Sequence, residues 1–178
     1  MFVAGFTGAG MQILLIMVMQ SFYGFAYLVT PLMITLFMGG LVAGTRVWRI
    51  VWRDPSLFKT TGLMWIMALL SAAAVVLLKT EQLFVRQWTG MMILGILNFL
   101  PGLIVGSVYG ILLALTRKEA PAAAGRLYSA DLAGAAMGSL IPPLFLVPLI
   151  GVSNTFILFC GFNVAAGLYL QSRKVIKL

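Results

Sequence analysis

Few side chains in this chain carry chemistry, and their types exclude most enzyme classes. The sequence has four acids, Asp54, Glu81, Glu119 and Asp131, one cysteine, Cys160, and no histidine. Without histidine there is no His-ligated metal or haem and no Ser-His or Cys-His nucleophile pair. A single cysteine forms no internal disulfide and holds no iron–sulfur cluster. We therefore expect no enzyme activity, no metal and no cofactor in this chain, so that any cofactor belongs to a partner chain.

Asp131 is the acid expected inside an apolar segment, about one turn from its start. A carboxylate in that position is costly unless it is paired or reaches water. Arg126, five residues earlier, and Arg46, at the inner end of another apolar segment, are its candidate partners. Two interpretations stay open. One is a structural ion pair that locks the cytoplasmic ends of the helices, and the other is a cation or proton site.

The apolar segments that position these residues are long enough to cross a bilayer. Hydrophobic residues make up 62% of the chain and charged residues 9%, against about 25% charged in a soluble domain. We predict an all-α, polytopic membrane protein with one transmembrane domain, residues 1–178. Pro101 is expected to kink the fourth span, and three prolines suggest a kinked or broken fifth span. Six spans are expected, at about 2–23, 25–45, 61–78, 89–116, 127–150 and 154–171.

The basic residues give the orientation. All but Lys79 and Arg86 of the 12 basic residues fall in three clusters, Arg46/Arg49/Arg53/Lys59, Arg117/Lys118/Arg126 and Arg173/Lys174/Lys177. Loops rich in Lys and Arg stay on the cytoplasmic side, and an even span count puts both termini on one side. We predict a bacterial inner-membrane protein with both termini cytoplasmic and with Gln82 and Ser153 outside. The net charge of +8 then reflects topology, and no nucleic-acid partner is expected.

Glycines spaced four apart predict close helix contacts. Small residues at this spacing line one helix face and let another backbone approach. Contact within the chain is the main interpretation, and contact with another subunit or a sliding surface in a transporter is the alternative. The glycines are Gly40, Gly44, Gly102, Gly106, Gly110, Gly134 and Gly138.

The fifth span carries a recognisable motif. Residues 125–138 read GRLYSADLAGAAMG, and residues 146–151 read LVPLIG. This pattern resembles the membrane part of the spermidine synthase-like integral membrane proteins, in which one helix opens GRLYxxDxxGxxxG and ends hydrophobic-Pro-hydrophobic-hydrophobic-Gly. Residues 37–44, FMGGLVAG, look like that family's FMxGLxxG segment, and residues 11–20 look like the helix before it. The positions that match the longer motif are Arg126, Tyr128, Asp131, Gly134 and Gly138.

The resemblance implies a major-facilitator-like half. Members of the family usually join such helices to a soluble aminopropyltransferase-like domain, which this chain lacks, so polyamine synthesis is not carried over. The membrane part of the family gives these residues no settled role.

Two functions follow as hypotheses. The leading one is a non-catalytic membrane subunit that anchors and scaffolds a larger inner-membrane assembly, for example a redox or electron-transfer complex. Its partners would be the lipid bilayer and other membrane or periplasmic subunits, including any cofactor-bearing chain. The alternative is a half-transporter with three-plus-three pseudo-symmetry for a small solute or polyamine. Its cavity lining would have to come from Asn98, Ser107, Tyr109 and Asp131.

Overall fold

The computed structural model describes residues 1–24, 26–51, 54–80, 86–116 and 121–175. Within these ranges the chain is all-helical and contains no strand, which confirms the predicted all-α class. The elements are α1 (Phe2–Tyr23), α2 (Ala26–Val51), α3 (Leu57–Lys79), α5 (Gln87–Thr116), α6 (Pro121–Ile141), the π-helical turn η1 (Pro142–Leu146) and α7 (Val147–Val175).

Several helices are longer than their predicted spans. α2 continues to Val51 instead of ending near residue 45, and α3 begins at Leu57 instead of near residue 61. The side chain of Ser56 accepts a hydrogen bond from the Phe58 amide at 3.3 Å, and this cap fixes the start of α3. α6 begins at Pro121. Proline is favourable at this position because the amide hydrogen that it lacks would have no hydrogen-bond partner within the first turn of a helix. Apolarity locates the part of a helix inside the hydrocarbon layer, whereas caps and prolines determine where it begins.

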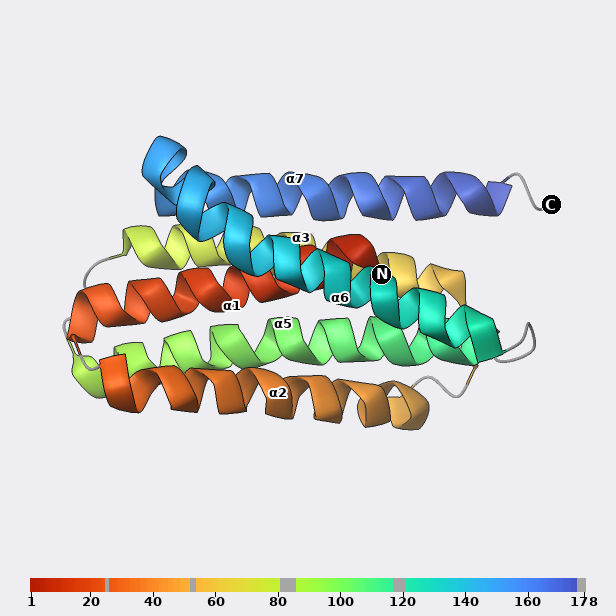
Figure 1. Ribbon diagram of the computed structural model, residues 1–178, viewed down its shortest axis with the longest axis horizontal. Coiled ribbons are helices and arrows are strands. Elements are labelled where there is room, and N and C mark those ends of the chain that lie inside the picture. Colours follow the sequence, from red (N-terminus) through yellow and green to blue (C-terminus); the bar gives the residue numbers. More distant parts are fainter. Residues whose placement is uncertain (25, 52–53, 81–85, 117–120, 176–178) are drawn as a thin grey trace.

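The prolines of α5 and of the fifth segment act differently. α5 continues as one helix through Pro101, and the kink expected at this proline stays a prediction. In the fifth segment, Pro142 and Pro143 open the π-helical turn, a common accommodation of disrupted helical hydrogen bonds. The chain then reaches Gly151, whose φ of 81° and ψ of 167° interrupt the helix. Only glycine adopts this conformation readily, and the chain reverses its direction there (Figure 1).

Five helices of the described chain are long and apolar enough to cross a membrane. The last of them, Ala122–Ser172, has 51 residues and includes the interruption at Gly151. The protein is therefore a multi-pass membrane protein by length and composition.

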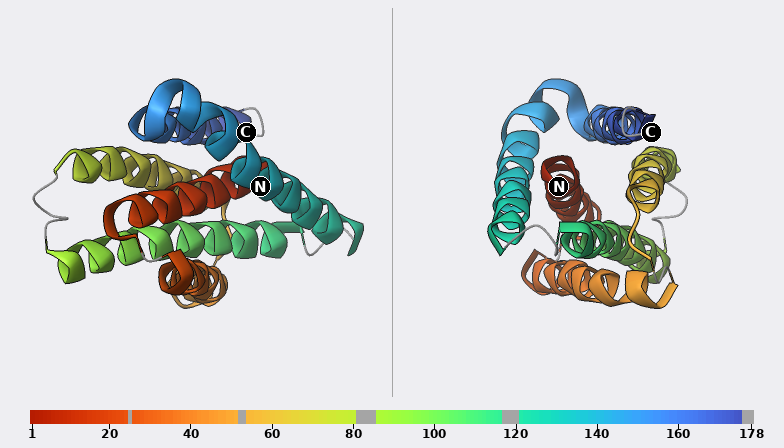
Figure 2. Two further views of the ribbon diagram at one scale, coloured as in Figure 1. Left: turned by 60° about the vertical axis from the view of Figure 1, so that its left-hand side comes forward. Right: turned by 90° about the vertical axis from the view of Figure 1, so that its right-hand side faces the viewer.

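The helices pack in three pairs around a central crossing. α2 lies along α5, α6 along α1, and α3 along α7. Figure 2 shows α1 and α5 in the interior of the bundle, with α2 and α6 on their outer sides. Accordingly, α1 and α5 are the most buried of the apolar helices, and α2 and the α6–α7 stretch are the least buried.

The α2–α5 pair packs through glycines on both helices. A Cβ atom on Gly40 would overlap the carbonyl oxygen of Phe99 and lie 3.0 Å from the nitrogen of Leu103. In return, a Cβ atom on Gly102 would overlap the carbonyl oxygen of Phe37. Real Cβ atoms do not approach backbone so closely, so both positions require glycine.

The α1–α6 pair repeats this arrangement. A Cβ atom on Gly134 would overlap the carbonyl oxygen of Phe2 and lie 3.0 Å from the nitrogen of Phe6, and one on Gly5 would overlap the carbonyl oxygen of Asp131. In both pairs each glycine meets the carbonyl of the residue three positions before the partner glycine, and the amide of the residue one position after it. The two interfaces therefore share one register.

When the two pairs are compared in chain order, the shared register relates α5 to α1 and α6 to α2. Gly8 of α1 faces Val105 of α5. Gly8 lies three residues after Gly5, and Val105 lies three residues after Gly102, so Gly8 and Val105 are equivalent positions that contact each other. The two pairs run in opposite directions (Figure 1). The bundle thus contains two helix pairs that share one register and have opposite orientations.

Candidate functional site

The seven glycines expected at helix contacts all lie against a neighbouring helix. Gly110 receives the indole ring of Trp48, and the other six meet the backbone of a partner helix. Three further contact glycines, which were not predicted, lie on α1: Gly5, Gly8 and Gly10. The sequence around Gly5 indicates its role, because Phe2-x-x-Gly5-Phe6 resembles Phe99-x-x-Gly102-Leu103 around a glycine that was predicted.

Asp131 lies on α6 where this helix crosses α1. Its Oδ1 atom would lie 2.7 Å from a Cβ on Gly5, so the absence of a side chain at Gly5 makes room for the carboxylate. Oδ1 is buried and has no hydrogen-bond partner. Small residues on α1 therefore hold a carboxylate against the helix crossing without satisfying it.

The structure does not bring Asp131 together with the arginines expected to pair with it. Arg126 and Arg46 are both exposed, and no ion pair within 4.0 Å joins any of the described residues. Arg126 is exposed on α6, whereas Asp131 lies against Gly5 of α1. The charged group that acts electrostatically on Asp131 is the amino group of Met1, from beyond ion-pair distance.

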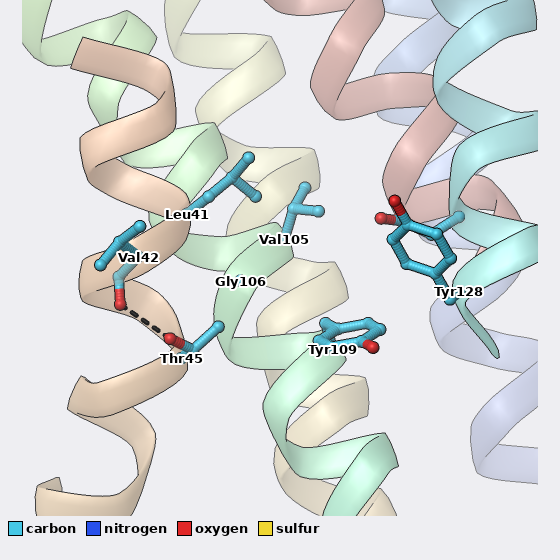
Figure 3. Close-up of a pocket in the computed structure, with 8 residues that line it drawn as sticks. Leu41, Val42, Thr45, Val105, Gly106, Tyr109 and Tyr128 are labelled. Atoms are coloured by element: carbon cyan, nitrogen blue, oxygen red, sulfur yellow. Dashed lines mark hydrogen bonds between the residues drawn. The ribbon is translucent and has the colours of Figure 1, made fainter. Parts of the chain in front are cut away.

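A cavity of about 250 Å³ opens beside Asp131. It lies between α2, α5 and α6, and Figure 3 shows Tyr109 of α5 and Tyr128 of α6 extending toward the same space. The lining residues are Leu41, Val42, Thr45, Val105, Gly106, Tyr109, Tyr128 and Asp131.

The walls of the cavity are mostly apolar. The Thr45 hydroxyl donates a 2.8 Å hydrogen bond to the carbonyl oxygen of Val42 (Figure 3), so its proton is already engaged. The remaining polar groups are the carboxylate of Asp131 and the two tyrosine hydroxyls. Within the described chain no three metal-ligating side chains come together. This arrangement can hold a positive charge beside an aromatic and aliphatic surface.

Two of the polar residues considered for a cavity serve helix packing instead. Asn98 is fully buried, and its amide donates to the carbonyl oxygen of Met33 on α2. The Ser107 hydroxyl donates to the carbonyl oxygen of Gly44 at 3.1 Å. Both residues connect α5 to α2, so only Tyr109 and Asp131 of the four candidates line the cavity.

The two pair interfaces differ at equivalent positions. The residue three before the α2 glycine is Phe37, whereas the one three before the α6 glycine is Asp131. At these equivalent positions of the described chain, the α1–α6 interface has a charge and the α2–α5 interface has an aromatic ring.

No protein-family model, curated protein or solved structure matches this chain. The function is accordingly argued from the geometry of the bundle and of the cavity.

Proposed function

We propose that this chain is a non-catalytic six-span membrane subunit, built like a major-facilitator-type half, that anchors and scaffolds a larger inner-membrane assembly. The observation that carries the proposal is the shared register of the α2–α5 and α1–α6 interfaces. Inverted repeats of three helices form the six-helix halves of such membrane proteins, and two halves form the complete body.

The six-span topology is part of this proposal. A 51-residue apolar stretch is too long for one crossing, and the interruption at Gly151 divides it into two antiparallel arms. An inverted repeat also requires an odd number of spans in each half, which supports three plus three. The end of α2 and the beginnings of α3 and α6 lie at one end of the bundle (Figure 1), and these helix ends carry Arg46, Arg49, Lys59 and Arg126. The end of α3 and the beginning of α5, with Lys79 and Arg86 beside them, lie at the other. This bias supports cytoplasmic termini.

The partner would cover the face between α2 and α6, which we name the α2/α6 face. Met38 and Leu132 occupy equivalent positions on these helices, one turn from the cavity residues Val42 and Tyr128, and both are about half exposed. An apolar face that flanks a cavity suits a second membrane unit better than water. A cofactor-bearing subunit of a redox complex is one partner of this kind.

Site-specific photocrosslinking in native membranes tests the scaffold proposal. A crosslinker at Met38 or Leu132 should give a discrete protein adduct that mass spectrometry identifies. The matched controls are Leu69 on α3 and Ile157 on α7, which are as exposed but lie on the pair opposite the α2/α6 face. Lipid adducts alone at all four positions, with the chain migrating as a monomer, would contradict the proposal.

Reporter fusions test the topology. A fusion after Arg49 should be active only in the cytoplasm, and a fusion at Ser153 only outside. A C-terminal fusion is decisive because six spans place it in the cytoplasm and five place it outside. Activity outside at the C-terminus would mean that the chain after Gly151 does not cross the membrane separately.

A half-transporter is the second candidate function, and the cavity beside the unpartnered Asp131 favours it. Intramembrane carboxylates facing cavities mark many substrate and proton pathways. Two such units would enclose the cavity between them. Uptake of a small solute or polyamine into proteoliposomes that contain the purified chain tests this function, and uptake equal to that of empty liposomes would count against it.

A further inference from the structure

We propose that the cavity between α2, α5 and α6 binds a small, monovalent organic ammonium ion, with Asp131 as its counter-charge. The inference rests on the membrane placement proposed above, but it holds whether or not the chain transports the ion. It concerns binding, which is measurable on the purified protein.

The charge of the site comes from an unsatisfied carboxylate. Oδ1 of Asp131 is buried without a hydrogen-bond partner, and the nearby arginines, Arg46 and Arg126, stay exposed. The amino group of Met1 acts on the carboxylate electrostatically but does not hydrogen-bond Oδ1. A half-buried carboxylate inside a membrane is costly unless it is paired. The cavity that Asp131 lines offers the space from which an external cation would pair with it.

The walls determine the class of cation. A metal ion such as Ca²⁺ or Mg²⁺ takes six or more oxygen ligands, whereas this cavity offers one carboxylate and three hydroxyl groups among apolar side chains. Tyr109 and Tyr128 extend toward the same space (Figure 3). Aromatic rings attract ammonium groups through their faces, and Leu41 and Val105 suit the carbon portion of an organic ion.

Charge limits the ligand further. The pocket of about 250 Å³ has room for a small organic ion, and among the described residues Asp131 is the one acidic side chain that lines it. A monovalent ion is therefore matched in charge, whereas the additional ammonium groups of a polyamine would meet no second carboxylate in the described lining.

Ligand-dependent thermal unfolding of the full chain in lipid nanodiscs tests the proposal. Butylammonium and tetramethylammonium are the probes, and potassium and neutral butanol are the controls. Both ammonium ions should raise the unfolding temperature with saturation, and potassium and butanol should not. Asp131→Asn should weaken ammonium binding about tenfold or more, because a charge-assisted contact is lost.

The aromatic contribution has its own variants. Tyr109→Leu should weaken binding about two- to thirty-fold, whereas Tyr109→Phe, which keeps the ring, should restore most of it. Asp54→Asn and Tyr27→Leu change the same residue types at exposed positions far from the cavity and should leave binding unchanged. If Asp131→Asn does not fold, the two Tyr109 variants decide the question.

Three results would overturn the proposal. They are the absence of saturable ammonium binding, equal affinity of wild type and Asp131→Asn, and an equal response to potassium and butylammonium. Failure of the scaffold function looks different, because ammonium binding would then persist while crosslinking at Met38 gave no protein partner. Binding without uptake would likewise retain this site and reject only transport.

Discussion

The α2–α5 and α1–α6 pairs have the same backbone interface but different side chains around it. Both use glycines in one register, with equivalent approaches to carbonyl oxygens and amides. At the position three residues before the outer-helix glycine, α2 has Phe37, which is buried, and α6 has Asp131. Ser107 bonds to Gly44 in one pair, whereas the equivalent residue in the other pair is Gly10, which lies near the carbonyl oxygen of Gly138.

The comparison separates what holds the bundle from what distinguishes its two sides. The glycines supply close contact, so the positions beside them are free to differ. One pair uses that freedom for an aromatic side chain and a hydrogen bond. The other pair uses it for an unpaired carboxylate beside a cavity.

The largest effects should come from the shared glycines. Gly44→Leu and Gly138→Leu should each destabilise the protein by about 3 kcal/mol or more, because the new side chain meets partner backbone that cannot move aside. Folded yield in detergent and thermal unfolding measure this. Gly161→Leu is the matched control, since that helical glycine faces open space. If only one of the two pair variants lost stability, the interfaces would not be equivalent.

Making the two pairs more alike should stabilise the protein and remove its ligand site. Asp131→Leu should raise the free energy of unfolding by about 1–3 kcal/mol, because it removes a buried oxygen that has no partner. Ammonium binding should disappear at the same time. Unfolding in detergent and ligand-dependent unfolding in nanodiscs provide the two measurements. A destabilised Asp131→Leu protein would indicate that the carboxylate has a stabilising partner.

Removing the extra hydrogen bond of the α2–α5 pair should have a modest effect. Ser107→Ala should cost about 0.6–1.7 kcal/mol, the range for interhelical bonds in membranes, because Gly44 loses its hydroxyl donor. Ser129→Ala is a suitable control, since that exposed hydroxyl bonds only within its own helix. A loss for Ser107→Ala no larger than that of the control would show that the bond adds nothing to pairing.

The smallest effect should come from Arg126. The sequence suggested an ion pair with Asp131, but Arg126 is exposed and no described residue pairs with it. Arg126→Gln should therefore change stability by less than about 0.5 kcal/mol. A loss of 3–5 kcal/mol, typical of a broken buried pair, would restore the original ion-pair interpretation.

Patterns within single helices made most of the fold predictable. Apolar length and basic clusters gave the membrane class, and GxxxG spacing gave the contact faces of α2, α5 and α6. The pairing of helices was not predictable, because Gly5 and Gly134 are far apart in sequence and their register depends on packing in space. Asp131 was identified as the exceptional acid, but its surroundings were not predictable because proximity along α6 says nothing about the α1 surface opposite it.

The inverted register has a consequence for how the protein enters the membrane. A half-turn about the crossing of Gly8 and Val105 exchanges the Gly5–Gly134 contact with the Gly102–Gly40 contact, so the two ends of the bundle resemble each other at these contacts. The charged residues differ between the two ends, since the positions equivalent to Arg46 and Arg49 are Leu140 and Pro143. We therefore expect a few surface arginines, and not these glycine contacts, to decide the direction of insertion.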